Sequence, residues 1–201
     1  TNTGTGDSTV WLYDEATGLL TNKLYSDGNG TAYSYTSDGK LETRNWARGI
    51  STTYSYTNTT GEMVGIDYSD STPDITFTFD RLGRRTQVTQ GDTGIPACVF
   101  HSFSYDPATL ALTNETIVAD GVTNIISRSQ DNLGRASGLD LALGGTAASL
   151  SVSYGYSDLG RFGTVDSVVQ GVTNNWQYSY LANSELLSGV SNSAGFATLR
   201  E

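Results

Sequence analysis

The fold is decided by a short stretch, Phe77-Thr78-Phe79-Asp80-Arg81-Leu82-Gly83-Arg84-Arg85. Its first residues alternate aromatic and hydroxyl side chains, and a period of two indicates an extended strand with its rings on one face. Gly83 follows Phe79 by four residues, at a position where a hairpin turn favours a positive φ. The stretch therefore predicts a β-strand that ends near Phe79 and reverses through a tight turn.

The same unit recurs along the whole chain. One residue, which we call the anchor, precedes each turn, and all anchors but one are aromatic. The anchors are Tyr13, Tyr35, Tyr56, Phe79, Tyr105, Gln130, Tyr156 and Tyr180. Their mean separation of about 24 residues is that of one hairpin per repeat. We therefore predict about eight units, each with a strand, a tight turn, a second strand and a looser connection.

The turns share two kinds of residue. Six units place a glycine four or five residues after the anchor, namely Gly18, Gly39, Gly61, Gly83, Gly134 and Gly160. In the fifth unit Leu110 lies near the expected glycine position. Four units place an aspartate directly after the anchor, namely Asp14, Asp80, Asp106 and Asp131. A short carboxylate in a turn accepts hydrogen bonds from backbone N–H groups, so we interpret these aspartates as turn caps and not as catalytic acids.

Composition favours the same fold class. The chain contains 12 Tyr and 23 Gly, with 37% hydrophobic and 16% charged residues, and no stretch has a helical apolar stripe. We predict an all-β chain, one array over residues 1–201, whose tandem antiparallel hairpins form a spiralling open sheet, a β-shell or a solenoid-like array. One hairpin cannot bury its aromatic face alone, so we expect the array to belong to a longer chain or to assemble end to end.

Charge and chemistry limit the function. A net charge of −10 argues against nucleic acid, and the absence of a long apolar run argues against membrane insertion. The chain has one histidine and one cysteine and lacks a Gly-x-Ser-x-Gly motif, which disfavours zinc and serine hydrolase chemistry. We expect His101 to point away from its flanking rings and Cys98 to be a small buried apolar residue. The prediction is no enzymatic activity, no metal and no cofactor.

Several turns resemble the YD repeat of RHS proteins. The resemblance rests on Tyr13-Asp14-Glu15-Ala16-Thr17-Gly18-Leu19-Leu20-Thr21 and on Phe79-Asp80-Arg81-Leu82-Gly83-Arg84-Arg85. Similar turns are Gln130-Asp131-Asn132-Leu133-Gly134-Arg135 and Tyr156-Ser157-Asp158-Leu159-Gly160-Arg161. The family includes bacterial RHS toxins, the shell subunits of insecticidal toxin complexes and the teneurins of animal cell surfaces. The resemblance implies a sheet that spirals into a hollow shell, which in the toxins sequesters a C-terminal effector.

Three functions remain open at this point. The first is a structural segment of a large secreted or cell-surface protein, of bacterial source, that builds a toxin shell or an extracellular filament. Its partners would be further repeats of its own chain or identical copies joined by edge-strand pairing, with an encapsulated effector or glycans as further partners. The second is a carbohydrate-binding, adhesive module in which Trp11, Trp46 and Trp176 stack on sugar rings. The third is a hydrolase with a pair of acidic residues, although no pair stands out in the sequence.

Overall fold

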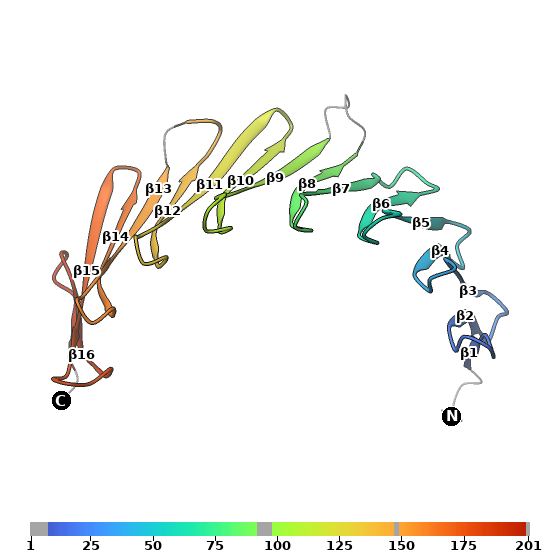
Figure 1. The fold of residues 1–201 in the computed structure, drawn as a ribbon, viewed down its shortest axis with the longest axis horizontal. Helices are drawn as coiled ribbons and strands as arrows, with labels where there is room; N and C mark the ends of the chain where they lie inside the picture. The colour runs from blue at the N-terminus through green and yellow to red at the C-terminus, as the bar shows by residue number, and fades with distance from the viewer. Residues whose placement is uncertain (1–7, 92–97, 147–148, 200–201) are drawn as a thin grey trace. The chain divides into compact units, whose positions relative to one another are not determined.

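The computed structural model describes residues 8–91, 98–146 and 149–199 (Figure 1). Every helix or strand assigned in these ranges is a strand, so the predicted all-β class is confirmed. The strands are β1 (Thr9–Tyr13), β2 (Leu20–Tyr25), β3 (Gly30–Tyr35), β4 (Leu41–Asn45), β5 (Ser51–Tyr56), β6 (Met63–Tyr68), β7 (Ile75–Phe79), β8 (Arg85–Gln90), β9 (Val99–Tyr105), β10 (Leu112–Ala119), β11 (Val122–Gln130), β12 (Ala136–Ala142), β13 (Leu150–Tyr156), β14 (Phe162–Val169), β15 (Val172–Tyr180), β16 (Leu187–Asn192) and β17 (Ala197–Leu199). They belong to two compact units, Thr1–Cys98 and Val99–Glu201.

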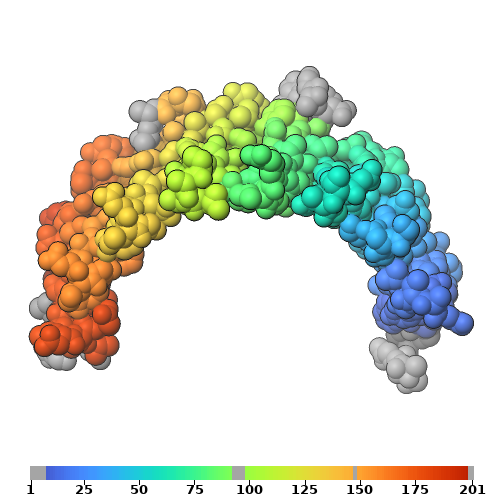
Figure 2. Space-filling view, viewed as in Figure 1, coloured from blue at the N-terminus to red at the C-terminus, as the bar shows by residue number. Residues whose placement is uncertain are grey.

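Each unit is an antiparallel meander. In the first unit β1 to β8 pair with their neighbours in sequence order. In the second unit β9 to β17 do the same. Figure 2 shows the successive hairpins of each unit side by side, from blue to green in the first and from yellow-green to red in the second. The predicted open sheet of tandem antiparallel hairpins is confirmed.

In every hairpin that begins with an anchor strand, a β-bulge follows the turn. In the third hairpin Tyr56 is paired with Met63, whereas Ser55 is paired with Gly65, so Val64 has no partner on β5. The same shift of one residue occurs next to all eight anchors. A bulge strengthens the local twist and changes the direction of the side chains beside it. The anchors thus share one backbone position, which includes Gln130 although it lacks an aromatic ring.

The two faces of the sheet differ in composition. Residues directly opposite each other on paired strands share a face, so Tyr54 lies with Ile66 on one face and Ser55 lies with Gly65 on the other. The described residues contain one buried hydrophobic side chain, Cys98, which is 7% exposed. Stability therefore depends largely on contacts between side chains of adjacent strands and not on a compact core.

Two connections between hairpins are tighter than the sequence suggested. Asp120 and Gly121 have φ values of 51° and 75°, and Gln170 and Gly171 have φ values of 49° and 81°. Positive φ at both central residues is the pattern of a two-residue type I′ hairpin turn. The prediction of looser connections is wrong at these two places, where glycine allows the strands to reverse at once.

Candidate functional site

The anchors all lie at the ends of strands. Each is the last residue of an odd-numbered strand from β1 to β15, directly before the turn. The N–H group of the residue after the anchor donates to the carbonyl of the last turn residue, as in Asp80 to Arg84 at 2.9 Å and Asp131 to Arg135 at 2.9 Å. This hydrogen bond closes the loop and places the residue after Gly83 or Gly134 at a constant position beside the anchor strand.

One turn position requires a left-handed backbone. The turn glycines identified from the sequence have positive φ, for example 82° at Gly39 and 76° at Gly134. Leu110 occupies the corresponding position of the fifth hairpin with a φ of 62°. A side chain with a Cβ is strained in this region by about 1–2 kcal/mol. The fifth hairpin therefore forms its turn despite an unfavourable residue.

The turn aspartates accept backbone hydrogen bonds. Oδ1 of Asp131 accepts from the N–H groups of Leu133 and Arg135, both at 2.9 Å, and Oδ2 accepts from Nε of Arg135 at 2.7 Å. The hydrogen bond from the Arg135 side chain is the largest reason why the pKa of Asp131 lies below its ordinary value. Asp80 makes the same set of contacts with Leu82 and Arg84.

Asp14 and Asp106 belong to loops that are one residue longer. Oδ1 of Asp106 accepts from the N–H groups of Ala108 at 2.9 Å and Thr109 at 2.6 Å. The hydrogen bond from the Thr109 backbone is the leading cause of the lowered pKa of Asp106. Oδ1 of Asp14 similarly accepts from the N–H and the hydroxyl of Thr17. These contacts give each of the four aspartates a structural place in its turn.

Three anchors bind the hairpin before their own. The hydroxyls of Tyr35, Tyr56 and Tyr156 each donate a hydrogen bond of 2.8 Å to a backbone carbonyl. The acceptors are the carbonyls of Leu20, Leu41 and Ala136, each of which is the first residue after the preceding turn. We call this arrangement the inter-hairpin tyrosine contact.

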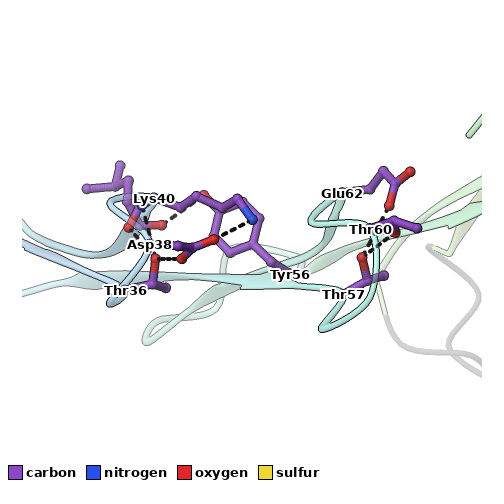
Figure 3. Close-up of polar contacts among 8 residues, drawn as sticks. Thr36, Asp38, Lys40, Tyr56, Thr57, Thr60 and Glu62 are labelled. Carbon is purple, nitrogen blue, oxygen red and sulfur yellow. Dashed lines mark hydrogen bonds and ion pairs between the residues drawn. The ribbon is translucent and has the colours of Figure 1, made fainter.

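A cation from the same preceding turn lies over the anchor ring. Nζ of Lys40 is 5.3 Å from the ring centre of Tyr56, and Cζ of Arg135 is 4.1 Å from that of Tyr156. Cζ of Arg161 is 4.4 Å from the ring centre of Tyr180. Figure 3 shows Lys40 beside Tyr56, with Asp38 pairing with the lysine. Such cation–π contacts contribute about 0.5–1 kcal/mol each at exposed sites.

These basic residues were missed by sequence reasoning. Lys40, Arg135 and Arg161 each follow a turn glycine directly, and the recurring Gly-Lys or Gly-Arg dipeptide was the available signal. The role of this dipeptide depends on the next hairpin, because its cation contacts the anchor ring of that hairpin and not the anchor of its own hairpin.

His101 lies in a charged cluster on three neighbouring strands. Its Nε2 is 3.3 Å from Oε2 of Glu115, whose Oε1 is 2.6 Å from Nη2 of Arg128. The His101 ring also packs against Phe103 in a tilted arrangement, with a centroid distance of 4.2 Å. The expectation that His101 points away from its flanking rings is wrong, because residues two apart on a strand share a face.

Open grooves lie between successive turns. A groove of about 690 Å³ is lined by residues of the turns 36–40 and 57–61 and by Tyr54 and Tyr56 of β5. No group of three histidine, cysteine or acidic side chains suited to a metal ion occurs in residues 8–91, 98–146 and 149–199. In the same ranges, no helix is long and apolar enough to cross a membrane.

The three tryptophans have different environments. Trp11 is 52% exposed. Cζ of Arg44 lies 3.5 Å from the ring centre of Trp46, and Nε1 of Trp46 donates a hydrogen bond of 3.0 Å to the Thr52 hydroxyl. The ring of Trp176 packs edge-on against Phe196. Nζ of Lys23 lies 6.0 Å from the ring centre of Trp11, so all three rings have a partner within the chain.

Comparison with known proteins relates the fold to toxin complexes. No protein-family model matches the sequence, and no curated protein is similar to it. The crystal structure of TcdB2-TccC3-TEV matches with a TM-score of 0.50 and 11% identity, over 92% of this chain and 13% of that chain. The structure of the Photorhabdus luminescens Tc holotoxin pore, with the mutation TccC3-D651A, matches with a TM-score of 0.50 and 12% identity, over 90% of this chain and 13% of that chain. A crystal structure of TcdB2-TccC3 matches with a TM-score of 0.50 and 12% identity, over 95% of this chain and 14% of that chain.

These similarities concern the fold. The chain spans 13% to 14% of the length of the three structures, and its sequence identity to them is at most 12%. They support an RHS-like β-repeat fold, as the YD-type turns suggested.

Proposed function

We propose that this chain is a structural β-repeat segment of a large RHS-type protein and has no enzymatic role. The observation that carries the proposal is the inter-hairpin tyrosine contact. Tyr35, Tyr56 and Tyr156 each use their hydroxyl to join one hairpin to the hairpin before it. A residue placed in this way acts on the array and not on a small molecule.

The energetics of a single hairpin support the proposal. An isolated two-stranded hairpin is marginally stable in water, and the net contribution of one hydrogen bond is about 0.5–1.5 kcal/mol. The contact therefore stabilises the chain only when hairpins are neighbours, so stability grows with the number of repeats. This dependence suits a protein that builds an extended wall.

The exposed apolar surface is consistent with an assembled state. Large hydrophobic side chains remain exposed in both units, for example Leu82 at 62% and Leu133 at 75%. Burying such side chains against another protein surface is favourable, by about 25 cal/mol per Å² of apolar area. We propose that the parent protein is secreted or displayed at the surface of a bacterial cell, where its repeats enclose an effector or continue as a filament.

Electron microscopy of the intact parent protein tests the proposal. A structural role predicts closed capsules or helical fibres, which differ at low resolution. The presence of compact monomers alone, together with turnover of a polysaccharide that one Asp or Glu substitution abolishes, would contradict it and support the acid-pair hydrolase.

A further inference from the structure

Strand β1 has an edge without a partner in the described residues. β1 pairs with β2, and the structure shows no second strand on its other side. Both faces are also open, because consecutive residues point to opposite sides and all are exposed: Val10 at 48%, Trp11 at 52%, Leu12 at 43% and Tyr13 at 59%. An edge of this kind can accept another strand.

Tyr13 occupies the anchor position of this strand. It ends β1, lies beside the register shift between β1 and β2, and precedes a turn closed by the hydrogen bond from the Asp14 N–H to the Leu19 carbonyl at 2.9 Å. Tyr56 and Tyr156, at the same position, each bind a carbonyl and a cation of the preceding hairpin. Tyr13 has neither contact within the described part of the chain.

We propose that the free edge of β1 is a docking site for a β-hairpin whose turn ends in Gly-Lys or Gly-Arg. The second strand of that hairpin pairs with β1, its first carbonyl accepts a hydrogen bond from the Tyr13 hydroxyl, and its cation lies over the Tyr13 ring. The proposal rests on the structural function proposed above and specifies the chemistry of the partner at this site.

Two observations identify this occupant. The contact is already made inside the chain, where Leu41 supplies the carbonyl and Lys40 the cation for Tyr56. Asp14 and Glu15, which follow Tyr13 directly, are exposed and add negative charge beside the ring, which favours a cationic partner. A second copy that docked through its own β1 would bring another tyrosine edge and no turn cation.

A peptide taken from the chain tests the site. The peptide Tyr33–Asn45 contains the last three residues of β3, the turn and all of β4. It includes Gly39-Lys40-Leu41 and has no tryptophan. Titrated into the intact chain, it is expected to bind saturably and to shift the tryptophan emission, because Trp11 lies in β1. Replacing Lys40 by Ala in the peptide should weaken binding, whereas Ser37→Ala at the turn tip should not.

Variants of the chain locate the peptide. Tyr13→Phe removes one hydroxyl and should weaken binding roughly fivefold, the equivalent of one net hydrogen bond. The matched control is Tyr25→Phe on the neighbouring strand, where the hydroxyl has no hydrogen bond in the described structure and the ring keeps its contact with Lys23. Binding to Tyr25→Phe should equal binding to the unmutated chain.

Three outcomes would overturn the proposal. The first is that the peptide does not bind at millimolar concentration. The second is that the peptide binds Tyr13→Phe and the unmutated chain with equal affinity. The third is that the chain forms a dimer that is lost in Tyr13→Ala but is not dissociated by the peptide. The proposed function is tested separately, because it requires the contact of Tyr56 inside the chain to stabilise the fold whether or not β1 binds the peptide.

Discussion

The guanidinium carbon of Arg135 lies 4.1 Å from the centre of the Tyr156 ring, although the two residues belong to consecutive hairpins. The same guanidinium pairs with Asp131 at 2.6 Å, and the Tyr156 hydroxyl donates to the carbonyl of Ala136 at 2.8 Å. One arginine thus joins its own turn to the next anchor. Loss of either contact should lower the free energy of unfolding of the whole unit.

Tyr56→Phe should lower the free energy of unfolding by about 1 kcal/mol, because it removes the hydroxyl that bonds to the Leu41 carbonyl and keeps the ring under Lys40. Urea unfolding followed by circular dichroism measures the change. Tyr33→Phe is the control, since that ring contacts Arg44 and its hydroxyl has no hydrogen bond in the described structure. Equal losses in the two variants would show that the contact has no special role.

Phe79→Tyr should stabilise the chain by about 1 kcal/mol. Gly65 on β6 is paired with Thr76 on the antiparallel strand β7. If this register continues for three more residues, Phe79 lies opposite Glu62, the last residue of the preceding turn. A hydroxyl at this position should reach the carbonyl of Met63, as Tyr56 reaches Leu41. Phe77→Tyr, on the same strand and face, should give no gain, and a gain of similar size there would refute the explanation.

Leu110→Gly should stabilise the chain by about 0.5–1 kcal/mol, because glycine has no strain at a φ of 62° although it loses more backbone entropy on folding. The reverse change, Gly134→Leu, should destabilise it by about 1 kcal/mol. A Cβ at Gly134 meets no heavy atom within 4 Å, so a clash of the Cβ does not add to the backbone strain. Thermal or urea unfolding of both variants checks the pair, and a destabilised Leu110→Gly would argue that its side-chain contacts matter more.

Stability should fall in acid. The folded pKa values of Asp106 and Asp131 lie below the ordinary value of 3.8, so the charged carboxylates stabilise the fold fully at pH values well above 3.8. This stabilisation is lost as the pH falls from about 4 through the lower folded pKa values. The urea midpoint should therefore be constant near neutral pH and decrease below about pH 4.

Asp131→Asn should reveal this linkage at one turn. The variant should be less stable than the unmutated chain at pH 7, and the difference should shrink in acid, as the pH falls from about 4 through the lower folded pKa of Asp131. Asp158→Asn is the control, since Asp158 is an exposed turn carboxylate without a hydrogen bond in the described structure. A difference between Asp131→Asn and the unmutated chain that stays the same from pH 7 down to the acid unfolding of the chain would contradict the explanation.

Local pattern was sufficient for the repeat unit. Alternation at Tyr54-Ser55-Tyr56 predicts a strand because side chains of an extended chain alternate between two faces, and Gly39 or Gly83 predicts a turn because few other residues tolerate a positive φ. The turn role of Asp131 follows from the same local geometry, since all its hydrogen bonds are to residues within four positions. Interactions of such short range are encoded in short stretches of sequence.

Contacts between hairpins depended on the tertiary structure. Tyr56 and Leu41 are 15 residues apart, and Tyr156 and Ala136 are 20 apart, so the register of two adjacent strands and a bulge at each anchor decide whether they meet. The alternation of aromatic and hydroxyl residues determines neither the register nor the position of the bulge. A shift of the pairing by one residue leaves this sequence pattern unchanged but moves every side chain to the other face. Sequence alone therefore identifies the hairpins, and only the paired strands show how one hairpin holds the next.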